Sequence, residues 1–239
     1  FKARTAIPEE ERDRAVFAKY PTIAAFQADL PGILGRLGFR PEMAQFLSTK
    51  ITVDPPRGAG HAMGARMRSG DAHLRTRVPS KGMDYKGYNI ALHEFGHTVE
   101  QVLTLNKVDR TLLFGVPNTA FTEAFAFVFQ DRDLEVLGLA KRDEMTKALS
   151  AIDTFWMTFE IAGVGLLDVA MWHWMYDHPD ATPAQLREAV VAEAIATWNR
   201  YYAPVFGVKD SPLLAIYSHM ICYGMYLPDY PIGHLIQFQ

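Results

Sequence analysis

Helical periodicity is the feature that most constrains the fold of this chain. From about residue 88 to the end, apolar residues recur at helical spacing. Gly- and Pro-containing stretches predict breaks in this region at 114–118, 177–183 and 204–212. Residues 8–48 are also helical in pattern, with breaks expected at Pro21, at 30–32 (LPG) and at Pro41. We therefore expect a mainly α protein.

Residues 50–80 differ in character from the rest of the chain. They are rich in glycine and proline and contain short alternating runs, ITV at 51–53 and HLRTRV at 73–78. Such runs between turn residues predict two or three short strands. We expect a small antiparallel sheet at the edge of the helical fold. With no internal repeat and no low-complexity linker, 1–239 is predicted to be a single domain.

Composition limits the class of protein. The chain has 239 residues, of which 49% are hydrophobic and 21% charged, as is ordinary for soluble globular proteins. A net charge of −3 does not indicate the excess of positive charge that is typical of nucleic-acid-binding proteins. The single cysteine, Cys222, excludes an internal disulfide and leaves the compartment open, between cytoplasm and periplasm.

The most apolar stretch is residues 155–176. Glu160, Asp168 and His173 interrupt it, whereas a membrane span needs about 20 mostly apolar residues. A buried helix pair is therefore expected, and no membrane span. The N-terminus lacks an apolar signal region, and the chain stops within the apolar run LIQFQ. Both ends suggest a fragment, a processed chain or a piece of a larger protein.

Residues 93–97 read HEFGH and are the strongest chemical signal in the chain. His93 and His97 are four residues apart, so on a helix their imidazoles share one face and can bind one small cation. Glu94 lies beside them and can act on a water near the metal. This H-E-x-x-H pattern is typical of metallopeptidases. The alternative is an ordinary helix with buried or solvated histidines.

A third ligand is expected because catalytic zinc usually has three protein ligands. Glu123 follows His97 by 26 residues, within an otherwise apolar segment whose stripe is Phe121, Ala124, Phe125 and Val128. An isolated carboxylate in such surroundings is costly unless it is paired or bound to a cation. The alternative is a surface glutamate at the edge of the stripe. The preferred interpretation is a Zn²⁺ site formed by His93, His97 and Glu123.

These segments resemble the gluzincin peptidases. The closest likeness is to the group of angiotensin-converting enzyme, thimet oligopeptidase, oligoendopeptidase F and carboxypeptidase Taq. HEFGH is the form common in the oligopeptidases, and GVPNTAFTEAFAF (115–127) is similar to the stretch around the third ligand in the converting-enzyme group. The resemblance implies a helical zincin catalytic domain in which Glu94 is the general base.

Two further segments support the resemblance, which covers roughly 55–130 and 215–239. GHAMGA (60–65) matches an edge strand that binds the substrate backbone, so His61 and Ala62 are expected to bind substrate. At the C-terminus, the resemblance implies that His219 binds substrate, that Tyr226 lies near the substrate terminus and that Tyr230 stabilises the oxyanion. Tyr223 and His234 are rivals for these roles. A tyrosine that only packs at a helix start is the alternative for Tyr230.

The chain departs from the family in two respects. Family members often carry an acidic residue four positions after the ligand glutamate, where this chain has Phe127, so a ligand histidine must be oriented by other groups. Members are also usually more than twice as long, with a helical half that walls off a channel.

The sequence thus predicts a zinc metallopeptidase of the oligopeptidase or peptidyl-dipeptidase kind, acting on short peptides. The alternatives are a non-catalytic zinc-binding pseudo-peptidase and a subunit that needs a missing half. The partners expected are a peptide substrate and either a second copy of the chain or a missing N-terminal half.

Overall fold

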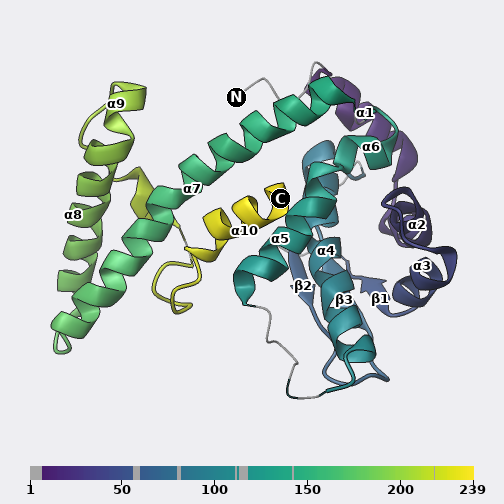
Figure 1. Ribbon diagram of the computed structural model, residues 1–239, viewed down its shortest axis with the longest axis horizontal. Helices are drawn as coiled ribbons and strands as arrows, with labels where there is room; N and C mark the ends of the chain where they lie inside the picture. The colour runs from purple at the N-terminus through teal and green to yellow at the C-terminus, as the bar shows by residue number, and fades with distance from the viewer. Residues whose placement is uncertain are drawn as a thin grey trace. The chain divides into compact units, whose positions relative to one another are not determined.

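The computed structural model describes residues 7–55, 60–79, 82–110, 112, 118–141, 143–217 and 219–239. The chain divides into two compact units, residues 1–151 (unit 1) and 152–239 (unit 2). Helices make up most of both units, with one small sheet in unit 1 (Figure 1). The prediction of a mainly α protein is confirmed. A single catalytic domain over 1–239 stays a prediction.

Unit 1 begins with three helices, α1 (Glu9–Lys19), α2 (Ile23–Arg36) and α3 (Pro41–Ser48). The breaks expected at Pro21 and Pro41 are confirmed. The break expected at 30–32 is wrong, because α2 continues through Pro31. Proline removes one backbone hydrogen bond from a helix. The buried face of Phe26, Leu30, Ile33 and Leu34 outweighs that loss by holding the helix on the core.

The sheet consists of β1 (Ile51–Val53), β2 (His61–Met63) and β3 (Ala72–Arg75) in the order β1-β3-β2. A small sheet within 50–80 is therefore confirmed, but the expectation that it is wholly antiparallel is wrong. β2 runs antiparallel to β3, whereas β1 runs parallel to it. The segment between β1 and β3 is long enough for a crossover, which returns the chain beside β1 in the same direction. β2 lies at an edge of this sheet.

Helix α4 (Tyr85–Lys107) is the centre of unit 1. Its N-cap Asp84 accepts a hydrogen bond from the backbone N–H of Gly87 at 2.7 Å. It packs against β2 and β3 and, most extensively, against α5 (Thr119–Asp131), which α6 (Asp133–Leu137) follows. The break expected at 114–118 lies mostly outside the described residues. α5 and the strands thus surround the helix that carries HEFGH.

Helix α7 (Glu144–Asp177) begins in unit 1 and continues through unit 2. The helix pair expected around 155–176 is wrong, because α7 is one helix of 34 residues. Its Gly163 does not break it. The backbone N–H of Gly163 donates to the Tyr202 hydroxyl at 2.8 Å, and a Cβ there would come within 2.4 Å of that side chain. The absence of a Cβ on Gly163 therefore allows the Tyr202 ring to pack against the backbone of α7.

The remaining elements complete unit 2. They are α8 (Pro183–Tyr201), α9 (Ala203–Phe206), the 3-10 helix η3 (Leu213–Ile216) and α10 (Asp229–Phe238). α8 starts with a capping box in which Thr182 and Gln185 exchange hydrogen bonds, so the break expected at 177–183 is confirmed. A separate apolar core that includes Leu167, Trp198 and Leu227 holds this unit together.

Helix α7 is also the one helix of the described residues whose length and composition would suffice to cross a membrane. The core helix of a soluble protein can have the same length and composition. Asp168, near the middle of the apolar stretch, is fully buried and accepts a hydrogen bond from the backbone N–H of Ile221. The absence of a membrane span stays a prediction.

Candidate metal centre

Three potential metal ligands converge between α4 and α5. His93 and His97 occupy successive turns of α4, and their Nε2 atoms are 3.1 Å apart. Oε2 of Glu123, on α5, lies 3.4 Å from Nε2 of His93 and 3.6 Å from Nε2 of His97. The structure thus brings together the three residues that the sequence singled out.

The spacing of these atoms fits a small tetrahedral ion. Zinc binds imidazole nitrogen and carboxylate oxygen at about 2.0–2.2 Å, so two ligand atoms of a tetrahedral site lie about 3.3 Å apart. The three separations here, 3.1, 3.4 and 3.6 Å, are close to that value. The donor set of two imidazoles and one carboxylate also leaves a fourth position, as catalytic zinc sites do. The residues present therefore fit zinc.

Close packing of α4 on α5 makes this convergence possible. Gly96 faces Ala126, and a Cβ on Gly96 would lie 2.6 Å from the Ala126 Cα. The face of α5 that points inward carries Ala120, Glu123, Ala124 and Phe127. The stripe expected from the sequence was partly wrong, because Phe121 and Val128 are exposed. Contact with α4 decides which face is buried, and it takes Glu123 inward.

Burial and charge have opposing effects on the pKa values of Glu123 and His97. The Glu123 residue is only 2% exposed, so the alternative of a surface glutamate is wrong. Burial disfavours its charged form, but hydrogen bonds and charge from His93 and His97 outweigh burial and hold the pKa of Glu123 well below its usual range. Burial likewise lowers the pKa of His97, yet Glu123 raises it above the ordinary value. The carboxylate is thus held in the ionised form that a cation needs.

Glu94 lies next to the ligands without joining them. It follows His93 on α4, and burial raises its pKa, while the charges of His93, His97 and His61 act in the opposite direction. A Cβ on Gly60 would lie 3.2 Å from Oε1 of Glu94, so the start of β2 passes directly beside this carboxylate. A partly desolvated carboxylate with a raised pKa is suited to accept a proton.

The edge strand β2 carries the two substrate-binding residues expected from this part of the chain. His61 is exposed and pairs with Arg75 of β3, and Ala62 pairs with Leu74. Gly60, the chain neighbour of His61, lies so near Glu94 that an added Cβ would be 3.2 Å from Oε1, so His61 begins the strand beside this carboxylate. An edge strand can accept an extended peptide through its backbone. The structure therefore brings His61 and the strand containing Ala62 to the same site as Glu94.

The group that supports His93 was not identified from the sequence. Phe127, at the position where the resemblance implies an acid, instead packs its ring 5.2 Å from the His93 ring. Nδ1 of His93 lies 3.0 Å from Oε1 of Gln130, one turn further along α5. Gln130 in turn contacts Asn89 of α4. Asn89 could have been found from a polar stripe at four-residue spacing along α4, namely Tyr85, Asn89, His93 and His97, whereas Gln130 has no such sequence signal.

The residues expected from the C-terminal segment gather in unit 2. His219 packs against Tyr223 and Tyr226, with ring centroids 5.5 and 5.7 Å apart, and Tyr226 packs edge-on against Tyr230 at 5.3 Å. Tyr230 is half-buried in the first turn of α10, and the rival His234 is buried in the same helix. His219, Tyr223, Tyr226 and Tyr230 thus form one aromatic cluster. Their roles toward the metal centre of unit 1 stay predictions.

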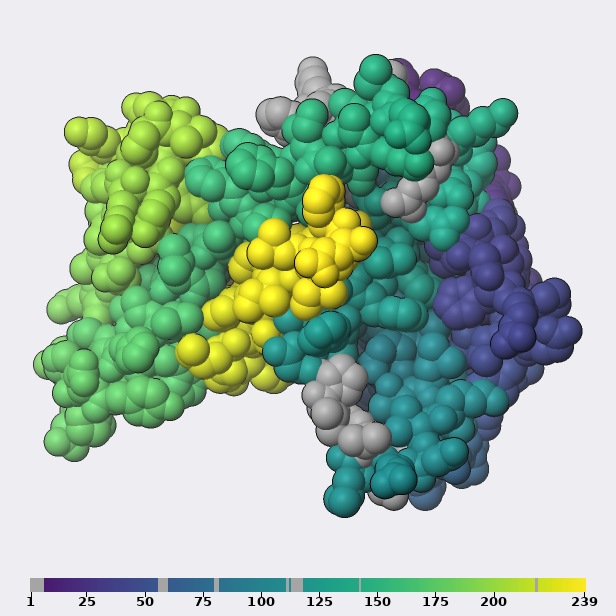
Figure 2. All heavy atoms as spheres, viewed as in Figure 1, coloured from purple at the N-terminus to yellow at the C-terminus, as the bar shows by residue number. Residues whose placement is uncertain are grey.

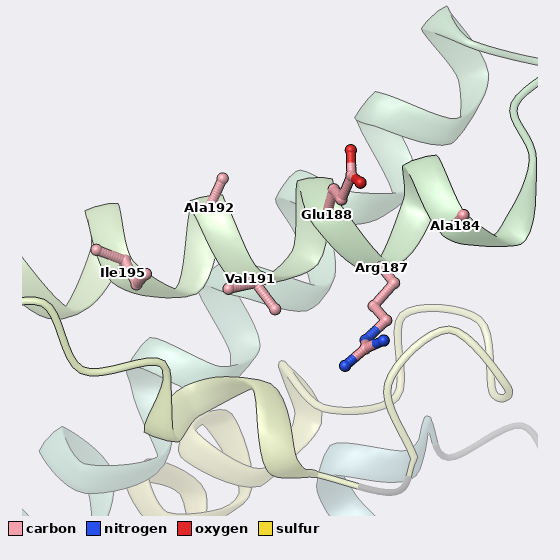
Figure 3. A pocket seen from close by; sticks show the side chains of 6 residues that line it. All are labelled: Ala184, Arg187, Glu188, Val191, Ala192 and Ile195. Carbon is pink, nitrogen blue, oxygen red and sulfur yellow. The ribbon is translucent and has the colours of Figure 1, made fainter.

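A pocket with a volume of about 490 Å³ is found on α8, but it lacks the features of a reaction centre. It is lined by Ala184, Arg187, Glu188, Val191, Ala192 and Ile195. All six side chains come from one helix (Figure 3), and this helix forms the light green surface in Figure 2. One guanidinium and one carboxylate among aliphatic groups offer no metal-ligand set. The candidate site is therefore the cluster on α4 and α5.

Comparison of the chain with models of protein families, with curated proteins and with solved structures found no match.

Proposed function

We propose that this chain is a zinc-dependent peptidase of the gluzincin type, with its reaction centre on α4 and α5. The observation that carries the proposal is the convergence of the His93, His97 and Glu123 donor atoms at separations suited to one zinc ion, with Glu94 beside them. Burying a carboxylate is costly unless it is paired or bound to a cation, and a cation at this position would contact all three donor atoms. The helical fold around the site agrees with this assignment.

Each residue has a defined task in peptide hydrolysis. His93, His97 and Glu123 would hold the ion, which when bound supplies Lewis acidity to the scissile carbonyl and to water. Glu94 accepts a proton from the attacking water and delivers it to the leaving amine. The raised pKa of Glu94 brings it closer to the pKa at which a carboxylate can both take and return a proton near neutral pH.

The edge strand and the aromatic cluster complete the proposal. β2, with His61 and Ala62, would align a short peptide by strand addition next to Glu94. The Tyr230 hydroxyl would donate a hydrogen bond to the oxyanion, and His219 and Tyr226 would bind the substrate. Tyr223 is the alternative candidate for the role of either tyrosine. The aromatic cluster supports this assignment by keeping all four residues together.

The test combines zinc analysis with hydrolysis of a short quenched fluorogenic peptide. The wild-type chain should hold about one zinc per chain, and a chelator should abolish hydrolysis. Glu94→Gln should keep the zinc and lose about 10²–10⁴-fold in turnover, since it removes the base but no ligand. Glu42→Gln, at an exposed carboxylate of α3, is the matched control and should change neither the zinc content nor the turnover.

The outcomes separate the alternatives. Hydrolysis by the isolated chain would exclude both the non-catalytic zinc-binding pseudo-peptidase and the subunit that needs a missing half. Zinc binding without hydrolysis of any peptide tested would favour these two alternatives over the proposed peptidase. Loss of zinc in Glu94→Gln would mean that this carboxylate is structural. A wild-type chain that binds no zinc would overturn the proposal.

A further inference from the structure

Behind His93, a chain of hydrogen bonds leads through two amides to a buried carboxylate. Nδ1 of His93 lies 3.0 Å from Oε1 of Gln130. Nε2 of Gln130 donates to Oδ1 of Asn89 at 2.7 Å, and Nδ2 of Asn89 donates to Oδ2 of Asp133, also at 2.7 Å. The chain starts on α4, crosses to α5, returns to α4 and ends on α6. We call these three supporting residues, Gln130, Asn89 and Asp133, the relay.

The direction of the relay follows from its last member. Each amide could be turned around by itself, so the direction must be set by a group whose role is fixed. An ionised carboxylate only accepts hydrogen bonds. Asp133 is 2% exposed, and its other oxygen accepts from the backbone N–H of Leu134 at 2.6 Å. The NH₂ group of Asn89 must therefore face Asp133.

The remaining orientations follow one after another. Because the NH₂ group of Asn89 faces Asp133, its side-chain oxygen faces Gln130. Gln130 must therefore donate a hydrogen bond to that oxygen from its own NH₂ group. Gln130 then presents its oxygen to Nδ1 of His93, which can bind it only as an N–H donor. With the N–H of Nδ1 on Gln130, the other ring nitrogen, Nε2, lies on the side of His97 and Glu123. A zinc-bound imidazole binds the ion through one nitrogen and keeps its N–H on the other, so this orientation presents Nε2 as the ligand atom.

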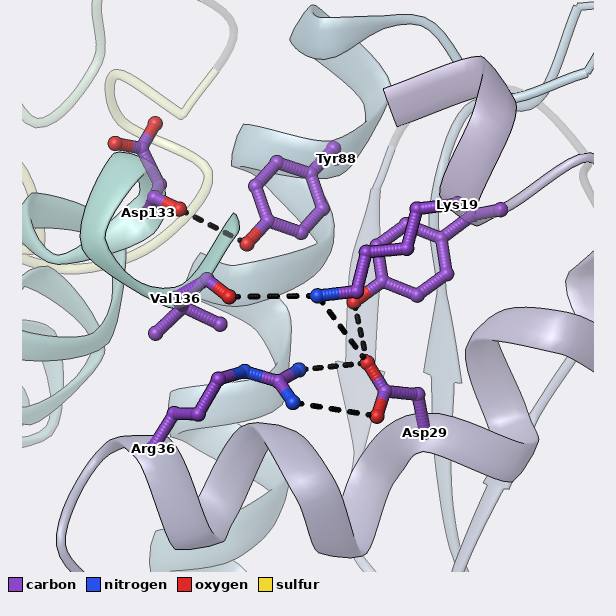
Figure 4. A network of polar contacts seen from close by, with 7 residues as sticks. Lys19, Asp29, Arg36, Tyr88, Asp133 and Val136 are labelled. Carbon is purple, nitrogen blue, oxygen red and sulfur yellow. Dashed lines mark hydrogen bonds and ion pairs between the residues drawn. The ribbon is translucent and has the colours of Figure 1, made fainter. Parts of the chain in front are cut away.

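The far end of the relay is held firmly. The Tyr85 hydroxyl donates to Oδ2 of Asp133, and the Tyr88 hydroxyl donates to its backbone oxygen at 3.0 Å. Figure 4 shows this second contact beside the network of Lys19, Asp29 and Arg36, in which Lys19 also reaches the backbone oxygen of Val136 on α6. Because α6 is fixed by these contacts, Asp133 cannot easily turn away from Asn89.

We propose that Asp133, acting through Asn89 and Gln130, is a positioning residue that keeps the Nδ1–H of His93 on Gln130 and so directs Nε2 at the metal centre. The use of Nε2 for zinc binding rests on the proposed function, whereas the hydrogen bond from Nδ1–H to Gln130 belongs to the orientation of the ring itself. The relay supplies from α6 the carboxylate that is missing at Phe127. A metal-ligating histidine typically needs such a partner for its second nitrogen.

The first experiment reads the proton at Nδ1 directly. ¹⁵N spectra of the His93 ring should show a protonated Nδ1 whose proton exchanges slowly with water. Asp133→Asn leaves the Gln130 contact in place but makes the end of the relay able to donate, so the amides can turn around and the Nδ1 proton should exchange faster. Gln130→Met removes the acceptor and should have the same effect. Gln45→Met, an exposed glutamine of α3, is the matched control.

The second experiment measures zinc affinity by competition with a chelating dye. Both relay variants should bind zinc about 10–100-fold more weakly than the wild type, the usual effect of losing a supporting partner of a ligand. Adding Gln130→Glu to Asp133→Asn places an acceptor-only group directly on His93. The double variant should therefore regain the slowly exchanging Nδ1 proton and most of the lost affinity, which a purely structural role of Asp133 would not allow.

Each result decides one part of the proposal. Unchanged exchange of the Nδ1 proton in both Asp133→Asn and Gln130→Met would overturn the relay. A slowly exchanging Nδ1 proton in a wild-type chain that binds no zinc would support the relay and reject the proposed function. If Asp133→Asn fails to fold, Gln130→Met and the Gln130→Glu single variant, which should keep the slowly exchanging Nδ1 proton, carry the test.

Discussion

Gly96 of α4 lies so close to Ala126 of α5 that a Cβ added to the glycine would meet the Ala126 Cα at 2.6 Å. The neighbour is backbone, so it cannot move aside as a flexible side chain could. One turn on either side of this contact are the groups of the metal centre, His93 on α4 and Glu123 on α5. The approach of the two helices therefore sets the distance between the histidines and the carboxylate.

Gly96→Ala should separate α4 from α5. We expect a loss of about 1–3 kcal/mol in the free energy of unfolding, as for other overpacked sites, together with weaker zinc binding. Gly35→Ala in α2 is the control, because nothing lies within 4 Å of a Cβ there. It should leave stability unchanged or raise it by up to about 1 kcal/mol. Urea unfolding and zinc titration measure both effects, and equal behaviour of the two variants would contradict the packing argument.

Glu123→Gln should remove the charged ligand while keeping the size of the side chain. The variant is expected to lose stoichiometric zinc, because a neutral amide is a much poorer ligand than a carboxylate. The Glu123 contribution that raises the pKa of His97 would also disappear. Elemental analysis after dialysis checks the result, with Glu42→Gln again as the control. One zinc per chain in Glu123→Gln would refute the ligand assignment.

Tyr230→Phe tests the role assigned to the aromatic cluster. If the hydroxyl stabilises the oxyanion only in the transition state, kcat should fall by roughly a hundredfold, with KM and zinc content nearly unchanged. The same substitution at Tyr223 and at Tyr226 provides the comparison. Should one of these variants show the loss in kcat instead, the oxyanion role belongs to that tyrosine.

Stability at alkaline pH should depend on Tyr20. Burial, followed by the hydrogen bond that its hydroxyl donates to Asp29 at 2.6 Å, raises the pKa of Tyr20 far above its usual value. The unfolded chain releases this proton near pH 10, whereas the folded chain retains it. Its contribution to stability is therefore complete below about pH 10 and is lost as the pH rises further.

Urea unfolding between about pH 8 and about pH 11 measures this dependence. The free energy of unfolding should fall with pH in the wild type, and less steeply in Tyr20→Phe. Tyr176→Phe, at an exposed tyrosine of α7, should keep the slope of the wild type. An unchanged slope in Tyr20→Phe would assign the alkaline loss to another group, for instance Tyr88, whose pKa burial also raises.

The features that could be predicted from the sequence are those encoded in short, local patterns. His93 and His97 share a helix face because they are four residues apart, and the ITV run became β1. Glu123 could be singled out because a charge is costly in an apolar segment. The metal centre was thus accessible from local rules combined with the chemistry of its ligands.

The features that were missed depend on contacts between distant segments. Pro31 did not end α2, because a buried face held the helix together. Phe121 and Val128 are exposed, because α4 covers the opposite face of α5. Gln130 and Asp133 carry no recognisable pattern by themselves, and only the packing of α5 and α6 on α4 places them behind His93.

The polar groups of the proposed centre and its relay lie between residues 89 and 133 of the chain. Joining them requires closure of only the short connection between α4 and α5, and the entropy lost on closing a chain grows with its length. The contacts themselves are not local, because His93 and Gln130 are 37 residues apart and Asn89 and Asp133 are 44 apart, against 21 for the pairing of Ile51 with Ala72 in β1 and β3. Early formation of the ligand set would therefore require α4 and α5 to be helical before they pack, so that only their connection remains to be closed.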